Sequence, residues 1–138
     1  MRQFYKDSVF IGLMVFPIPF WLLLGSGNIS RTAEHLTALI TICLLYPIVE
    51  ELLFRGTLQR WLNSKSHRVF LHFSLANILT SILFTLSHFV NQPPLSALAT
   101  FIPSLAFGYV MDRHKTVLAP VVLHISYNLG YFLSFGLN

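Results

Sequence analysis

Long apolar runs separated by short polar interruptions dominate this sequence. The runs cover about Ser8–Leu24, Leu36–Leu62, Val69–Val90, Leu95–Met111 and Val117–Leu137. A helix needs about 20 apolar residues to cross the roughly 30 Å hydrocarbon core of a bilayer. The pattern therefore predicts an all-α fold, a polytopic transmembrane bundle of about five helices. The fourth run is short, and we expect it to sit inside the bundle.

We predict that the first run is a retained helix. It contains Pro17 and Pro19, which a membrane helix tolerates when neighbours satisfy the backbone, and Gly25-Ser26-Gly27-Asn28 closes it. Arg2 and Lys6 precede it, as in a signal peptide. However, the run is long, holds bulky aromatic residues near its middle and lacks a clear small-x-small cleavage site.

The composition agrees with a membrane protein of one domain, residues 1–138. Of the 138 residues, 54% are hydrophobic and 10% are charged, and the mean hydropathy is +0.66. That leaves too little polar surface to coat a water-soluble globule. The single cysteine, Cys43, has no partner for an internal disulfide, and we expect it to pack as an apolar residue.

The formal net charge of +4 indicates membrane topology and no nucleic-acid partner, because the nine Lys and Arg residues form no basic run. Apart from Arg55, which lies inside the second run, they are at the ends of the predicted helices and in the loops, and they gather on alternate sides. Arg31 stands alone on one side, and seven lie on the other: Arg2, Lys6, Arg60, Lys65, Arg68, Arg113 and Lys115. The positive-inside rule then puts the N-terminus in the cytoplasm and the C-terminus outside, in the inner membrane if the host is bacterial.

Charged side chains inside the second run are the first candidates for chemistry. The sequence Glu50-Glu51-Leu-Leu-Phe-Arg55 lies in a predicted membrane helix, where an ionisable group costs about 3 kcal/mol or more. Glu51 and Arg55 are four residues apart and can pair on one face. Glu50 lies about 100° round the helix, so it is a spare carboxylate that suits a general base. The alternative is a solvated, charged helix end at the cytoplasmic surface.

The third run carries a stripe of Asn77, Ser81, Phe84 and His88, at i, i+4, i+7 and i+11. Because lipid offers polar atoms no partner, the stripe should face the bundle interior. His88 is a candidate catalytic residue. Its alternative role is that of an interhelical hydrogen-bond partner.

The fifth run places His124 and Asn128 at i and i+4, with Tyr131 continuing the face. An imidazole N–H and a carboxamide N–H aimed at one point can bind the negative charge that develops on a carbonyl oxygen during hydrolysis. The pair is therefore a candidate oxyanion hole, with helix packing as the alternative. The occurrence of all three patterns together is much less expected by chance than any one alone.

In this order on successive helices, EExxxR, FxxxH and HxxxN resemble the motifs of the CPBP family of intramembrane proteases. That family includes the CAAX prenyl endopeptidases and relatives linked to bacteriocin processing or immunity. The match runs from about Ile48 to Leu129, and Phe54-Arg55-Gly56, Gly108 and Leu118-Ala119-Pro120 agree with it. The resemblance implies an endopeptidase that cleaves a membrane-tethered peptide or C-terminal tail.

The resemblance also implies a role for each motif residue. The first glutamate and the first histidine would activate the attacking water, and the second histidine and the asparagine would stabilise the oxyanion. The remaining motif residues would orient and brace the site. The catalytic residues are then Glu50, His88, His124 and Asn128, with Glu51, Arg55 and Phe84 in support.

Two features depart from the family pattern. Fewer apolar segments than usual precede the glutamate motif, so a partner subunit or a second copy could cover exposed faces. If the helices stand perpendicular to the membrane, His88 lies near the outer end of the third helix and Glu50 lies near mid-membrane. His124 then lies nearer the inner end of the fifth helix. Tilt, a later start of the third helix near Ser74, or a water-filled cavity would reconcile these depths.

Other interpretations stay open. Glu50, His88 and His124 form a possible His₂Glu zinc set, but no HExxH motif is present, and we expect glutamate catalysis without a cofactor. A non-catalytic immunity or accessory protein could use the polar cluster for packing alone. A small transporter could use buried Glu and His, although neither half-helices nor an internal repeat is visible.

Overall fold

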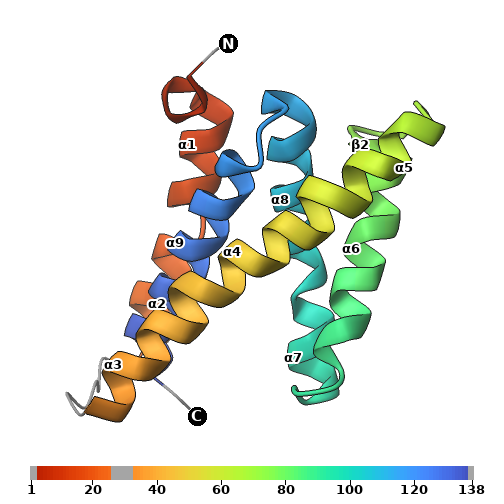
Figure 1. Ribbon diagram of the computed structural model, residues 1–138. Coiled ribbons are helices and arrows are strands. Elements are labelled where there is room, and N and C mark those ends of the chain that lie inside the picture. Colours follow the sequence, from red (N-terminus) through yellow and green to blue (C-terminus); the bar gives the residue numbers. More distant parts are fainter. Residues whose placement is uncertain (1–2, 26–32, 137–138) are drawn as a thin grey trace. The chain divides into compact units, whose positions relative to one another are not determined.

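The computed structural model describes residues 3–25 and 33–136, and these fold almost entirely into helices (Figure 1). Within this part of the chain the helices form five runs that correspond to the predicted ones. The predicted all-α class and helix number are therefore confirmed. Arg2, the turn at Ser26–Asn28, Arg31 and the predicted helix end at Leu137 lie outside the described residues.

Three of the described helices are long and apolar enough to cross a membrane: Leu36–Lys65, Pro94–His114 and Leu118–Phe135. Two further apolar helices, Ser8–Leu24 and Leu75–His88, are shorter. The protein is therefore an integral membrane protein.

The prediction that the fourth helix is short is wrong, since it has 21 residues. It continues past Met111 because the next residue, Asp112, has partners for its carboxylate. One oxygen accepts a hydrogen bond from Asn63 Nδ2 at 2.7 Å, and the other accepts one from Ser74 Oγ at 2.6 Å. The helix ends where Lys115 adopts the left-handed conformation, with a φ of 56°.

The chain divides into two compact units. One comprises Met1–Val49 and Val121–Asn138, and the other comprises Glu50–Pro120. The boundary between Val49 and Glu50 falls inside the longest helix, Leu36–Lys65. The interpretation of residues 1–138 as one domain stays a prediction.

In the first unit, the C-terminal helix packs against the two N-terminal helices. The unit contains η1 (Phe4–Lys6), α1 (Ser8–Val15), α2 (Ile18–Leu24), α3 (Ala33–Ile40), η2 (Thr41–Leu45), most of α4 (Tyr46–Glu51) and most of α9 (Leu118–Phe135). The ring of Trp21 meets that of Tyr127 edge to face, with centroids 6.1 Å apart. A Cβ at Gly130 would collide with the Trp21 ring, so glycine permits this close approach of α2 and α9.

Pro17 interrupts the first helical run between α1 and α2, and α9 compensates for the interruption. Pro17 has no N–H, so the Leu13 carbonyl four residues earlier lacks its helical donor. The Tyr127 hydroxyl donates to that carbonyl at 2.9 Å. A backbone group that a bilayer could not satisfy thus finds its partner inside the protein.

Pro47 has the same effect in the second run. In the wide turns of η2, a π-helix, the Tyr46 N–H bonds to the Thr41 carbonyl. The next carbonyl, that of Ile42, would need the N–H that Pro47 lacks. The Asn128 carboxamide donates to it instead, at 2.9 Å. Consecutive residues of α9 therefore satisfy two carbonyls that prolines leave without donors.

The second unit packs helices around a polar seam. It contains η3 (Leu52–Gln59), α5 (Arg60–Lys65), β1 (Val69–Phe70), β2 (Phe73–Ser74), α6 (Leu75–His88), α7 (Pro94–Ala99) and α8 (Phe101–His114). Helices α6 and α8 lie side by side (Figure 1). A Cβ at Gly108 would collide with the Asn77 carboxamide, which donates to the Leu105 carbonyl at 3.0 Å. The missing side chain thus leaves room for the polar contact.

The third helix begins later than the predicted Val69. Residues 69–74 form an antiparallel hairpin of two-residue strands, in keeping with the strand preference of aromatic and β-branched side chains. The Ser74 hydroxyl then accepts the Asn77 N–H at 2.9 Å and caps α6, which starts at Leu75. The alternative start near Ser74 is therefore the correct one.

Candidate functional site

A buried ion pair on the long helix is the centre of the candidate site. Arg55 Nε lies 3.2 Å from Glu51 Oε2, and both side chains are fully buried. The predicted pairing of these two residues on one helix face is confirmed. The alternative interpretation, a solvated and charged helix end, is therefore wrong for Glu51 and Arg55.

The guanidinium of Arg55 is held from two neighbouring helices. Its Nη2 donates to the Ser104 hydroxyl at 2.6 Å and to the Ser104 carbonyl at 2.9 Å. Its central carbon lies 4.7 Å from the centroid of the Phe84 ring and 5.7 Å from that of Phe107. A desolvated cation gains about 2 kcal/mol from such a ring. Arg55 therefore joins η3 to both α6 and α8.

The helix is widened where Arg55 projects. The segment η3 is a π-helix, a rare form that often marks functional positions. One turn after Arg55, the fully buried Gln59 carboxamide donates to the Gly108 carbonyl at 2.9 Å. The two residues give η3 a continuous polar face inside the unit.

The rings of Phe84 and His88 lie against each other along α6, with centroids 4.5 Å apart and planes inclined by 39°. His88 Nδ1 lies 2.8 Å from the Phe84 carbonyl oxygen. Since a carbonyl oxygen can only accept, Nδ1 carries the proton, and the lone pair of the neutral ring is on Nε2. His88 is thereby prepared to accept a hydrogen bond or a proton through Nε2. Phe84 contacts both Arg55 and His88, which is consistent with its predicted role in supporting the catalytic residues.

The two glutamates of the motif lie in different environments. Glu51 is buried against Arg55, whereas Glu50 is half-buried. Adjacent residues project about 100° apart round a helix, so Glu50 does not share the face of the ion pair. Glu50 belongs to the same unit as Arg55 and His88.

His124 and Asn128 belong to the other unit, on successive turns of α9. His124 is buried and Asn128 is half-buried. One N–H of the Asn128 carboxamide bonds to the Ile42 carbonyl, so the residue has a packing role. The four predicted catalytic residues are thus divided between the units, two in each.

Comparison with known protein families identifies the chain. Residues 32–130 match the family described as type II CAAX prenyl endopeptidase Rce1-like. The chain belongs to this Rce1-like family. The predicted resemblance to the intramembrane proteases is confirmed, and the protein is a membrane-embedded peptide hydrolase of the CAAX type. None of the curated proteins and none of the solved structures compared with the chain matches it.

The matched region contains every motif residue from Glu50 to Asn128. Among the residues that the structure describes, no group of three His, Cys, Asp or Glu side chains is arranged to hold a metal ion. The alternative zinc ligands of this Rce1-like chain, Glu50, His88 and His124, come from both units. Zinc therefore stays an alternative prediction.

Two polar residues of the Rce1-like site were not predicted. Gln59 lies one turn beyond Arg55, and Ser104 lies on α8, where Phe107 and Gly108 follow at i+3 and i+4. All of these are buried. Gln59 could have been found from its place four residues after Arg55, on the same helical face as a buried charge. Ser104 has no such signal in its own segment.

We expect Glu51→Gln to destabilise the protein by about 3–5 kcal/mol, because it leaves the Arg55 guanidinium buried without its counter-charge. Tryptophan fluorescence during thermal unfolding in detergent measures the effect. The matched control is Glu50→Gln, the same chemical change at the half-buried neighbour, which should unfold near the wild-type temperature. Equal stability of the two variants would show that the ion pair does not brace the site.

Proposed function

We propose that this Rce1-like protein is a glutamate-dependent intramembrane endopeptidase that cleaves a membrane-tethered peptide or C-terminal tail. The observation that carries the proposal is the Glu51–Arg55 ion pair. Because Glu51 takes part in this buried structural contact, we assign the role of general base to the other motif carboxylate, Glu50. Membership of a CAAX endopeptidase family supports peptide hydrolysis as the reaction.

Water is the nucleophile in the proposed reaction. Glu50 accepts a proton from the water molecule while His88 Nε2 accepts a hydrogen bond from it and orients it. The water oxygen bonds to the carbonyl carbon of the scissile peptide, and the carbonyl oxygen becomes negatively charged. When the tetrahedral intermediate collapses, the C–N bond breaks, and the proton on Glu50 passes to the leaving nitrogen.

His124 and Asn128 stabilise the oxyanion in this scheme. A preorganised donor aimed at a developing negative charge contributes about 3–4 kcal/mol to the transition state. A carboxamide has two N–H groups. One of those of Asn128 bonds to the Ile42 carbonyl and fixes the side chain, and we assign the other to the oxyanion.

We also propose that the N-terminus is cytoplasmic and the C-terminus is outside, in the plasma membrane if the host is bacterial. Asn63 and Ser74 both donate to Asp112, so the loop after α5 and the loop after α8 lie at one end of the second unit. Two of the seven positive charges on which the orientation was predicted, Arg68 and Lys115, lie in these loops, and two more lie at the adjoining helix ends, Lys65 and Arg113. Their common location supports this part of the assignment.

Glu50→Gln should abolish cleavage, because it removes the proton acceptor and keeps the volume of the side chain. The assay uses protein reconstituted in liposomes and a fluorophore–quencher peptide tethered by a farnesylated cysteine. The same peptide without the lipid should be cleaved much more slowly if tethering defines the substrate. Wild-type turnover by folded Glu50→Gln protein would refute the glutamate mechanism.

Chelation separates the glutamate mechanism from the zinc alternative. If Glu50 is the base and no metal takes part, dialysis against a chelator should leave the cleavage rate unchanged. A loss of activity that zinc alone restores would instead favour the zinc-dependent alternative, in which Glu50, His88 and His124 are the proposed ligands. Magnesium re-addition is the control for nonspecific salt effects.

His124→Ala and Asn128→Ala should each lower turnover per folded molecule by about 10²- to 10³-fold with little change in KM, since oxyanion donors act mainly on the transition state. Their combined effect should be smaller than the product of the two, because both donors address one charge. Asn128→Ala should also lower the unfolding temperature, because it removes the hydrogen-bond donor of the Ile42 carbonyl.

The matched control for Asn128→Ala is Tyr127→Phe. It removes the partner of the Leu13 carbonyl from the adjacent position of α9 and should lower stability while sparing turnover. If Asn128→Ala behaved in the same way, with turnover per folded molecule near wild type, Asn128 would be a packing residue only. If His124→Ala also kept its turnover, a non-catalytic role for the polar cluster would be favoured.

A further inference from the structure

In the described part of the chain, the buried Arg55 guanidinium donates its hydrogen bonds to one residue, Ser104. Its Nη2 bonds to the hydroxyl and to the carbonyl of Ser104. Its Nε faces Glu51 as an ion pair, and its Nη1 has no hydrogen-bond partner among the described residues. Ser104 is itself fully buried, on α8. A hydrogen bond to a charged group is stronger than one between neutral groups, so this hydroxyl matters for where the cation lies.

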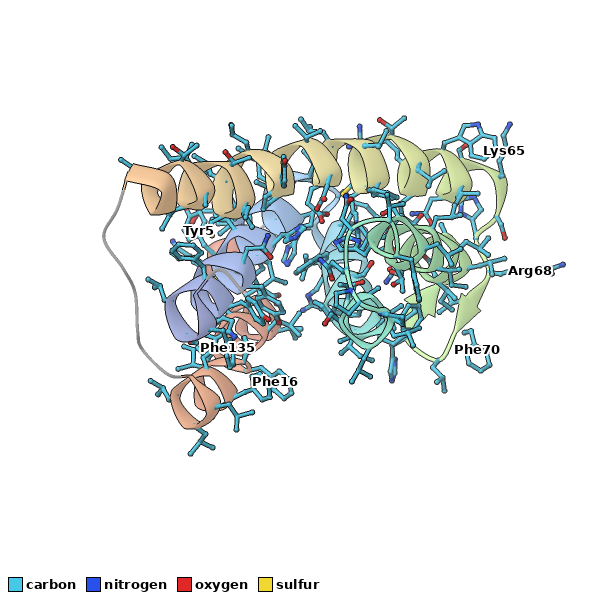
Figure 2. All side chains as sticks on the ribbon, turned by 90° about the horizontal axis from the view of Figure 1, so that it is seen from below. Tyr5, Phe16, Lys65, Arg68, Phe70 and Phe135 are labelled. Atoms are coloured by element: carbon cyan, nitrogen blue, oxygen red, sulfur yellow. The ribbon has the colours of Figure 1, made fainter. Side chains whose placement is uncertain are left out.

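Two anchored nitrogens fix the plane of the guanidinium, because the group is rigid and planar. The Nε atom lies 3.2 Å from Glu51 Oε2, and Nη2 lies 2.6 Å from Ser104 Oγ. Figure 2 shows the part of the long helix that ends near Lys65 lying across α6 and α8 of the second unit. Glu51 lies on the same long helix as Arg55. Ser104 is therefore the hydrogen-bonding residue that sets the guanidinium plane relative to the neighbouring helices.

The fixed guanidinium lies against the ring of Phe84. The central carbon of Arg55 is 4.7 Å from the ring centroid, and Phe84 is only 2% exposed. The ring of Phe54 meets the same ring edge to face, with centroids 5.2 Å apart. Because a desolvated cation is attracted to the face of an aromatic ring, the position of the guanidinium restricts the ring. Ser104 thus acts on Phe84 through Arg55.

Phe84 in turn holds His88 through two contacts. Its ring centroid lies 4.5 Å from that of the imidazole, and its carbonyl oxygen lies 2.8 Å from Nδ1. The hydrogen bond to the carbonyl keeps the proton on Nδ1 and leaves Nε2 as the acceptor. If the Phe84 ring moved, the imidazole would lose the surface it lies against and could rotate away from this hydrogen bond.

We propose that Ser104 is a positioning residue of this site. By fixing the Arg55 guanidinium against Phe84, its hydroxyl holds the His88 imidazole in the orientation in which Nδ1 is protonated and Nε2 can accept. Ser104 acts only through these other side chains. Its effect on turnover rests on the proposed function, in which His88 Nε2 orients the attacking water, whereas its effect on the imidazole needs no cleavage to be observed.

Heteronuclear NMR of the full chain with isotope-labelled histidine rings, in detergent micelles, tests the effect on the imidazole. The His88 signals are assigned by their loss in His88→Gln. At a pH where the ring is neutral, the wild type should carry the proton on Nδ1. Ser104→Ala removes the shorter of the two Arg55 hydrogen bonds, so the His88 signals should shift towards the Nε2–H tautomer. Unchanged signals in folded Ser104→Ala protein would overturn the proposal.

The matched control is Ser81→Ala, the same chemical change at another fully buried serine of the second unit. The Ser81 hydroxyl donates to Asn77 Oδ1 at 3.1 Å, so its removal leaves the hydrogen bonds of Arg55 in place. The His88 signals of this variant should match those of the wild type. An equal shift in both alanine variants would show that the loss of any hydroxyl in the polar seam disturbs His88, and would contradict a specific role of Ser104.

Phe84→Leu tests the second step of the same route, and it decides the matter if Ser104→Ala does not fold. It keeps an apolar side chain and both hydrogen bonds between Arg55 and Ser104, but it removes the ring that contacts Arg55 and His88. The His88 signals should again shift towards the Nε2–H tautomer. Wild-type signals in folded Phe84→Leu protein would show that the ring does not hold the imidazole, and the proposal would be wrong.

Turnover of the lipid-tethered peptide in liposomes separates positioning from packing. Ser104→Ala should lower kcat per folded molecule by about 10-fold and change KM by less than about 2-fold, because a hydrogen bond to a charged group is lost away from the substrate. Ser104→Thr keeps a hydroxyl and should recover most of kcat, and Ser81→Ala should retain it. A lower unfolding temperature of Ser104→Ala with wild-type kcat would make Ser104 a packing residue only. If the wild type itself did not cleave, the proposed function would fail, and the NMR comparison would still decide the role of Ser104.

Discussion

Polar groups buried in a bilayer must find their partners inside the protein, and this constraint organises both units. In the first unit, Pro17 and Pro47 each leave a carbonyl without its helical donor, and two consecutive residues of α9 supply the missing hydrogen bonds. In the second unit, the Arg55 guanidinium needs a carboxylate, a hydroxyl and aromatic faces, and three helical segments provide them. The positions of the helices within each unit thus follow from a small number of polar contacts, because apolar side chains pack against lipid nearly as well as against each other.

The buried ion pair gives a reason for two glutamates in the motif under the proposed mechanism, in which Glu50 is the general base. A guanidinium buried without a counter-charge would strongly destabilise the protein, so the carboxylate beside Arg55 has a structural role. A single glutamate could not brace Arg55 and also exchange protons with water at each turnover, because protonation would remove the counter-charge. Two adjacent carboxylates on different faces of one helix would separate these tasks: Glu51 lies in the packed interior, and Glu50, the proposed base, lies at a half-buried position.

The helices and the Glu51–Arg55 contact could be predicted from sequence because both depend on local spacing. Apolar runs longer than a membrane span define helices, and residues four apart share a helix face. The hairpin at 69–74 was not predicted, since most of its residues continue the apolar run of the predicted third helix. A start of that helix near Ser74 was one alternative, but it came from comparing the depths of the motif residues and not from the local pattern. Helix α8 was expected to end before Asp112 because a carboxylate usually closes an apolar run. Its partners Asn63 and Ser74 come from other parts of the chain. Ser104 was missed for the same reason: nothing in its own segment shows that Arg55 lies opposite.

Side chains that hold this fold together can therefore also take part in its chemistry. Asn128 is the clearest case, because the hydrogen bond that satisfies the Ile42 carbonyl also fixes the carboxamide plane, and with it the direction of the second N–H. An oxyanion donor contributes most when it needs no reorganisation during the reaction. The packing contact and the proposed oxyanion role are then compatible with one geometry, and a loss of stability on mutation would not count against catalysis. Only turnover measured per folded molecule separates them, which is why the neighbouring Tyr127, with the same kind of contact and no proposed chemistry, is the informative comparison.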